Sequence, residues 1–209
     1  MTLFDRVTDP ADLEAVRALE GLTNPRLRQE IGDITLMPPD ERVVGPGSTP
    51  IMAAFTHLQP DGSRFTDGSF GVYYCAASRT TAIRETVYHR ERFLRLSDEP
   101  PQTLEMRLYE AELAAELVDI EGTSHAPALL DPDSYAASRA FGVEARRQDV
   151  DGIRYPSVRD PGGTCAAVFR PRCISPPANQ TQHYGYRWNG QEITDVIELR
   201  ATGVRPHNI

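Results

Sequence analysis

Three signals for the start of a helix come before residue 60, each followed by apolar residues at helical spacing. Asp9-Pro10, Asn24-Pro25 and Ser48-Thr49-Pro50 each join a capping side chain to a proline that suits the first helical turn. They predict helices over residues 10–21, from 25 to about 32 and from 50 to about 58. Residues 38–50 are rich in Pro and Gly, and they predict a loop around a short strand.

The apolar run at residues 68–77 predicts a strand, and the pattern after it predicts a helix from Arg79 to about Leu94, capped by Ser78. Adjacent residues of a strand point to opposite faces, so Tyr73 is expected to face the core and Tyr74 a cleft. On the helix, Glu85 and His89 share a side with Ala82, Thr86 and Phe93. A carboxylate and an imidazole on such a face form a local conflict, which is typical of functional sites.

Shorter elements fill the second half of the chain. Leu104, Met106 and Leu108 alternate with polar residues and predict a strand, whereas the next run, AELAAELVDIEG, fits either a helix or a continued strand. Asp133 or Ser134 is expected to cap a helix that ends near Arg147. The remaining predictions are strands over 152–157 and 164–169 and a hairpin over 183–199, with a type I′ turn at Asn189-Gly190. This order predicts an α+β fold with mainly antiparallel sheets flanked by helices.

Composition excludes several classes of protein. The 209 residues include 40% hydrophobic and 25% charged residues, with no apolar run long enough to span a membrane and no secretory signal at the start. The net charge of −8 disfavours direct binding of nucleic acid. Three cysteines without metal-ligand spacing indicate buried thiols in a reducing cytoplasm, and no metal site is expected. All 22 basic residues are Arg, which excludes a Schiff-base or Walker-type lysine.

Candidate chemistry gathers around the predicted strand-to-helix corner at residues 63–92. Arg64 supplies a permanent cation, Tyr74 an aromatic ring and Glu85 a carboxylate. Such a corner suits an anionic ligand that carries an aromatic ring and a bond whose cleavage develops positive charge. Each residue taken alone also has an ordinary structural explanation, because acidic helix residues are mostly exposed and strand tyrosines are mostly core residues.

Three segments in order along the chain resemble the RES domain family, which is named for its Arg, Glu and Ser. GSRFTDGSFGVYYCAASRTTAIRETVYH resembles the family core, with Arg64-Phe65, Tyr74, Ala82, Glu85 and His89 in matching positions. GIRYPSVRDPGGTCAAVFRP resembles the serine segment, with Ser157, and HYGYRWNGQEITDVIEL resembles the C-terminal hairpin. Cys165 stands where many relatives have Asn, so that position receives no role. The resemblance covers roughly residues 40–200.

The resemblance implies a fold similar to ADP-ribosyltransferases and NAD⁺ as the substrate. It implies a single domain over residues 1–209, with a helical N-terminal extension at 1–40 and the catalytic core at 41–209. Its implied catalytic residues are Glu85, Arg64 and Ser157. The carboxylate of Glu85 would stabilise an oxocarbenium-like ribose, and the guanidinium of Arg64 would bind a phosphate.

Four residues are implied to bind the nucleotide beside Arg64. Tyr74 would stack on the nicotinamide, and Ser157 would position its ribose. His89 would orient Glu85 or contact the acceptor, and Arg159 would bind an acceptor phosphate.

The implied activity is that of a toxin that cleaves the nicotinamide–ribose bond of NAD⁺, by phosphorolysis with inorganic phosphate as co-substrate, or by hydrolysis. The implied partner is an antitoxin with an Xre-like helix-turn-helix domain, and the assembly is left open between a homodimer and a hetero-oligomer with it. Three alternatives remain: a mono-ADP-ribosyltransferase acting on a protein, a non-catalytic module that binds a nucleotide or a partner, and, as a weaker third, a glycosidase. No second acid stands out near Glu85 to favour the glycosidase.

Overall fold

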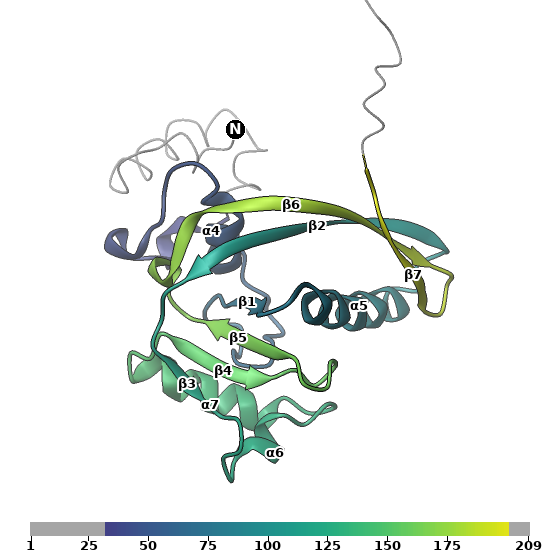
Figure 1. Ribbon diagram of the computed structural model, residues 1–209. Coiled ribbons are helices and arrows are strands. Elements are labelled where there is room, and N and C mark those ends of the chain that lie inside the picture. Colours follow the sequence, from purple (N-terminus) through teal and green to yellow (C-terminus); the bar gives the residue numbers. More distant parts are fainter. Residues whose placement is uncertain (1–31, 201–209) are drawn as a thin grey trace, which may run out of the picture. The chain divides into compact units, whose positions relative to one another are not determined.

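The computed structural model describes residues 32–200, and their helices and strands are labelled in Figure 1. The helices predicted over 10–21 and from 25 lie outside the described residues, apart from the end of the second at residue 32. The described chain divides into two compact units. The first unit holds residues 32–82 and 111–178, and the second holds residues 83–110 and 179–200.

The first unit contains a four-stranded sheet in the order β1-β5-β4-β3. Its strands are β1 (Tyr73–Ala76), β5 (Thr164–Val168), β4 (Gly152–Pro156) and β3 (Leu117–Asp119). β1 with β5 and β4 with β5 pair antiparallel, whereas β3 and β4 pair parallel. The β4–β5 hairpin confirms the strands predicted over 152–157 and 164–169.

Helices and 3₁₀ turns surround this sheet. They are η1 (Ile34–Leu36), η2 (Pro39–Glu41), α4 (Thr49–Thr56), α6 (Ala126–Leu129), α7 (Ala136–Arg147) and η3 (Pro171–Cys173). The helix α4 contacts β1, and α7 contacts β4. Phe65, Ile153, Ala167 and Phe169 are at most 1% exposed and form the centre of the core with Tyr155, whose ring meets the edge of Phe65 at 5.0 Å.

The second unit joins a helix to a long sheet. The helix α5 (Arg79–Leu96) starts in the first unit and continues into the second. The sheet has the order β2-β6-β7, with β2 (Gln102–Leu113), β6 (Ile174–Trp188) and β7 (Ile193–Glu198). The end of β2 and the start of β6 belong to the first unit. Hydrogen bonds tie α5 and its end to the β6–β7 hairpin, through the pairs Thr86 with Tyr186 (2.8 Å), Glu91 with the Ile193 N–H (2.8 Å) and the Glu99 carbonyl with Trp188 (2.9 Å).

The predicted α+β fold with mainly antiparallel sheets is confirmed, and so is the predicted strand at 104–108. The ambiguous run AELAAELVDIEG is strand: β2 continues to Leu113, and β3 follows after a break. The run does not form a helix despite its high helix propensity, because its backbone makes hydrogen bonds to other segments instead. One example is the hydrogen bond from the Ala114 N–H to the Cys173 carbonyl.

Two predictions near the start of the described chain were wrong. The loop at 38–50 contains no strand and instead forms η2, followed by turns at Gly45 and Gly47. The strand predicted over 68–77 is only Tyr73–Ala76. The segment before it curls, because the Thr66 hydroxyl donates to the Phe70 carbonyl and Gly68 has a φ of +98°.

Of two local details, one was predicted in part and one was wrong. The Ser134 hydroxyl accepts the N–H of Ala136, the first residue of α7, at 3.5 Å, although the N-cap residue is Tyr135, and the carboxylate of Asp131 accepts the N–H groups of Asp133 and Ser134. The β6–β7 connection is not a type I′ turn. Asn189 does not have the positive φ that this turn requires, and its side chain accepts the N–H groups of Gln191 and Glu192 within a longer loop.

Three further features bear on the sequence predictions. All three cysteines are free; Cys165 and Cys173 are buried, as predicted, whereas Cys75 is only half-buried. Burial raises the pKa of the Cys75 thiol to about 11, so the thiol stays protonated and unreactive. Among residues 32–200, no helix is both long and apolar enough to cross a bilayer.

The approach of α7 to the 63–66 loop yields a first prediction. A Cβ at Gly142 would lie 2.0 Å from the Phe65 carbonyl oxygen. Replacing a helical Gly with Ala ordinarily stabilises a protein by about 1 kcal/mol. We expect Gly142→Ala to lower the free energy of unfolding by about 1–3 kcal/mol, because the loop and helix must separate. Urea denaturation checks this, with the exposed Ala140→Gly on the same helix reporting the ordinary propensity effect. A more stable Gly142→Ala protein would contradict the close contact.

Candidate functional site

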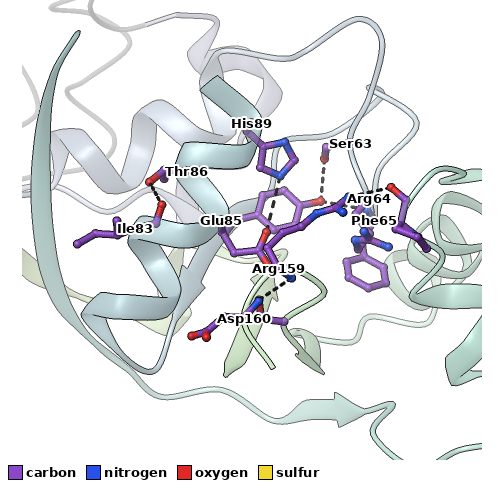
Figure 2. Close-up of polar contacts among 12 residues, drawn as sticks. Ser63, Arg64, Phe65, Ile83, Glu85, Thr86, His89, Arg159 and Asp160 are labelled. Carbon is purple, nitrogen blue, oxygen red and sulfur yellow. Dashed lines mark hydrogen bonds and ion pairs between the residues drawn. The ribbon is translucent and has the colours of Figure 1, made fainter. Parts of the chain in front are cut away.

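Tyr74 of β1 fixes the loop that precedes its strand. Its hydroxyl accepts the N–H of Phe65 at 3.0 Å and shares a hydrogen bond with the Ser63 hydroxyl at 2.7 Å (Figure 2). Desolvation of the phenol raises the pKa of Tyr74, and these two hydrogen bonds oppose that rise. The side chain remains 39% exposed and is the more exposed of the tyrosine doublet, because Tyr73 is half-buried. The hydroxyl end is therefore held while part of the ring stays accessible.

Arg64 lies next to these contacts and is only 8% exposed. Its Nη1 donates to the carbonyl oxygens of Leu129 (3.2 Å) and Asp131 (3.0 Å), and its guanidinium lies 4.5 Å above the ring of Tyr135. Cation–π contact and carbonyl acceptors both stabilise a buried cation. Both hydrogen bonds come from Nη1, so Nε and Nη2 do not take part in binding these two carbonyls.

Two more arginines bind carbonyl oxygens of the same loops. Arg139 of α7 donates from Nε to Ser63 (3.1 Å) and from Nη2 to Asp61 (2.6 Å). Arg159 donates from Nη2 to Pro132 at 2.8 Å. We call Arg64, Arg139, Arg159 and the carbonyls that they bind the arginine clamp. It joins the 61–65, 129–132 and 157–160 loops of the first unit.

Ser157 organises the third of these loops. Its hydroxyl oxygen accepts the N–H groups of Arg159 (3.1 Å) and Asp160 (2.9 Å), and the side chain is buried. The carboxylate of Asp160 in turn accepts the Thr81 hydroxyl at 2.7 Å. The N–H of Thr81 donates to Ser78, which confirms Ser78 as the cap of α5. Buried hydrogen bonds therefore connect the serine loop to the start of that helix.

The same loop requires glycine at position 163. A Cβ there would lie 2.6 Å from the Thr81 hydroxyl oxygen and 2.9 Å from the Asp160 carboxylate. Gly163 therefore leaves room for the Thr81–Asp160 hydrogen bond.

Glu85 and His89 lie on the part of α5 that belongs to the second unit. The His89 Nε2 is 3.9 Å from a carboxylate oxygen of Glu85, and the two side chains are 55% and 22% exposed (Figure 2). The prediction that these two residues share one side of the helix is thereby confirmed. A carboxylate that is mostly buried and next to an imidazole is suited to act on a developing positive charge.

The structure brings the predicted residues together in two groups. The first unit holds Arg64, Tyr74, Ser157 and Arg159, and Arg64 and Arg159 bind the carbonyls of adjacent residues, Asp131 and Pro132. The second unit holds the Glu85–His89 pair. The sequence suggested that the whole guanidinium of Arg64 is available to bind a phosphate. In the structure, its Nη1 instead donates to backbone carbonyl oxygens of the protein. The ligand-binding roles of all six residues stay predictions.

Sequence reasoning missed Tyr135, Arg139, Thr81 and Asp160. Tyr135 and Arg139 are four residues apart at the start of α7, and this spacing could have marked a shared face toward Arg64. The signal for Asp160 was its place in an Asp-Pro-Gly-Gly turn after Ser157. Nothing in the sequence links Thr81 to Asp160, since 79 residues separate them.

A carboxylate beside the arginine clamp partly offsets the positive charge of the clamp. The carboxylate of Asp131 accepts the N–H groups of Asp133 and Ser134, which lower its pKa below the ordinary value, and the charge of Arg64 adds to this effect. Asp131 is therefore ionised at neutral pH, and its negative charge partly offsets Arg64. Among residues 32–200, no group of three His, Cys, Asp or Glu side chains could hold a metal ion.

Comparisons with known proteins give two matches. The family model described as "RES domain" matches residues 40–189. A protein of Sinorhizobium fredii (strain NBRC 101917 / NGR234), described as "Uncharacterized protein y4oC", is 29% identical over 208 residues. That alignment covers 99% of this chain and 86% of the relative.

The buried Thr81–Asp160 hydrogen bond yields a second prediction. Thr81→Val keeps the shape of the side chain and removes the donor to a buried carboxylate. We expect it to lower the free energy of unfolding by about 1–3 kcal/mol. The neighbouring Thr80→Val is the matched control, because Thr80 is exposed on the same helical turn. Chemical denaturation of both variants checks the prediction, and equal effects would show that the bond contributes nothing.

Proposed function

The chain belongs to the RES domain family, and on this basis we propose that it is an NAD⁺-degrading enzyme that cleaves the nicotinamide–ribose bond. RES domains are associated with NAD-related toxins of toxin–antitoxin pairs. The observation that carries the proposal is the mostly buried Glu85 carboxylate on α5, in the family motif that also contains Arg64 and Tyr74.

The proposed reaction is a displacement at C1″ of the nicotinamide ribose. The C1″–N bond breaks with its electron pair going to the nicotinamide, which leaves as a neutral molecule. An oxygen of inorganic phosphate forms the new bond in phosphorolysis, and a water oxygen forms it in hydrolysis. The carboxylate of Glu85 stabilises the positive charge that develops on the ribose, and this stabilisation is strongest away from bulk water.

The residues of the first unit take the binding roles. Arg64 offers its remaining nitrogens to a phosphate of the dinucleotide, and the Tyr135 ring and the Leu129 and Asp131 carbonyls hold it in place. The accessible part of the Tyr74 ring stacks on the nicotinamide. Ser157 positions the ribose, and Arg159 binds the phosphate co-substrate. His89 orients the Glu85 carboxylate.

In the proposed setting, the protein is a cytoplasmic toxin held inactive by an antitoxin with an Xre-like helix-turn-helix domain. The antitoxin would bind it in a hetero-oligomer. Transfer of ADP-ribose to a protein target and binding without turnover remain the alternative activities, and product analysis separates them.

Removal of the carboxylate gives the third prediction. Purified protein incubated with NAD⁺ should release nicotinamide, and Glu85→Gln should lower kcat by ~100-fold or more while the far-UV circular dichroism is unchanged. Glu112→Gln, at an exposed position of β2, should behave as the wild type. Mass spectrometry identifies the product: ADP-ribose 1″-phosphate that requires added phosphate indicates phosphorolysis, and ADP-ribose indicates hydrolysis.

Two results would contradict this proposal. Binding of NAD⁺ without any nicotinamide release would indicate a non-catalytic module. Equal turnover by the wild type and Glu85→Gln would remove the carboxylate from the mechanism. Label from NAD⁺ recovered on an added protein would instead identify an ADP-ribosyltransferase.

Replacement of Arg64 gives the fourth prediction. Arg64→Lys keeps the charge but loses the planar fork and the stacking on Tyr135. We expect KM for NAD⁺ to rise by ~10-fold or more, together with a lower thermal midpoint, because the side chain is buried. Arg139→Lys is the matched control, since it also loses donors to two loop carbonyls. A comparable loss of stability with a much smaller change in KM is expected for it. The same rise in KM in both variants would assign Arg64 a structural role only.

A further inference from the structure

The C-terminal half of α5 exposes a stripe of four residues. His89, Arg92, Phe93 and Leu96 follow the i, i+3, i+4, i+7 spacing, so they lie along one side of the helix. All four are exposed, and Phe93 and Leu96 keep 56% and 79% of their surface accessible. We call these four residues the α5 stripe.

The opposite side of the helix accounts for its packing within the second unit. Leu94 is 2% exposed, and the half-buried Glu91 accepts the Ile193 N–H. Each residue advances about 100° around the helix axis, so Arg92 and Leu96, two positions from Leu94, point away from that packed side. Packing within the unit therefore does not require Phe93 and Leu96 to be apolar. Exposed helix positions that pack against nothing usually carry polar residues.

The charge of α5 is opposite to that of the chain as a whole. The helix carries five Arg and two Glu, a net charge of +3, whereas the whole chain carries −8. Arg90 and Arg95 flank the stripe, and Arg95 is paired with Glu91 at 2.7 Å. The stripe is thus an apolar pair bordered by cations on an acidic protein.

We propose that the α5 stripe is the docking surface for an acidic, amphipathic helical segment of another protein. Two apolar side chains of the partner would cover Phe93 and Leu96, and its carboxylates would pair with Arg92 and the arginines beside it. Apolar contact provides the affinity, and opposite charge provides the selectivity and speeds the encounter. This inference does not depend on the proposed enzymatic activity.

Charge disfavours two other occupants. In a symmetric dimer formed through this face, the stripe would meet its own copy, and the arginines would face arginines. An anionic membrane would attract the helix, but the rest of the chain carries −11 and would be repelled from the same surface. A separate acidic protein segment satisfies both the apolar and the cationic residues.

A displayed library of 16-residue helix-forming peptides, selected against the full-length protein, tests the proposal. We expect the selected peptides to be enriched in Asp and Glu around two apolar residues spaced three or four apart. The best peptide should lose at least ~10-fold in affinity, measured by isothermal titration calorimetry, for the double variant Phe93→Ala/Leu96→Ala and for Arg92→Glu. All these positions are exposed, so circular dichroism should show an unchanged fold.

Matched controls come from exposed positions in the first unit. Leu36→Ala/Val118→Ala removes two other exposed apolar side chains, and Arg147→Glu reverses another exposed charge. Both should bind the peptide as the wild type does.

The proposal would be overturned by no enrichment of acidic peptides, by an equal loss of affinity in the control variants, or by peptide binding that the stripe variants leave unchanged. Self-association of the wild type that Phe93→Ala/Leu96→Ala abolishes would overturn it in favour of a second copy. Stripe-dependent binding to phosphatidylserine vesicles without peptide binding would overturn it in favour of a membrane.

Discussion

Guanidinium groups bound to backbone carbonyls are the interaction on which the candidate site of the first unit depends. In the loops at 61–65, 129–132 and 157–160, arginine side chains bind the carbonyl groups of Leu129, Ser63 and Pro132, and each guanidinium has enough donors to bind more than one acceptor. Arg170, elsewhere in this unit, also binds two acceptors with one guanidinium, here the carboxylates of Glu41 and Asp149. A chain without lysine therefore uses its buried arginines as structural ties as well as charges.

Buried hydrogen bonds extend this constraint to the start of α5. The Ser157 hydroxyl holds the turn that presents Asp160, and Asp160 accepts the hydroxyl of Thr81 in the first turn of the helix. Gly163 leaves the space that these groups need. The consequence is that a serine singled out for a ligand also has a structural task. Loss of the Ser157 hydroxyl is therefore expected to disturb both the loop and the start of the helix.

The sequence predicted those parts of the molecule whose signals are local. The cap at Ser78, the shared helix side of Glu85 and His89, and the hairpin of β4 and β5 all follow from spacing within a short segment. The arginine clamp did not, because its partners are carbonyl oxygens, which every residue has and which leave no trace in the side-chain pattern. The curled segment before β1 was also missed, since Thr66 competes for the Phe70 carbonyl through a side-chain hydrogen bond that an apolar run conceals.

The same distinction explains why Arg64 looks different in sequence and in structure. The motif alone suggests that all donors of the Arg64 guanidinium are available to bind a phosphate. In the folded chain, that guanidinium is buried on Tyr135, bound to two carbonyls and accompanied by the ionised Asp131. These contacts fix the direction of its remaining donors. Because the side chain is already restricted, it would lose less conformational entropy on binding a ligand than a flexible side chain would. For an arginine that is held in this way and partly neutralised by a neighbouring carboxylate, geometry matters more than charge alone, and the dinucleotide of the proposed function would have to match the direction of its remaining donors.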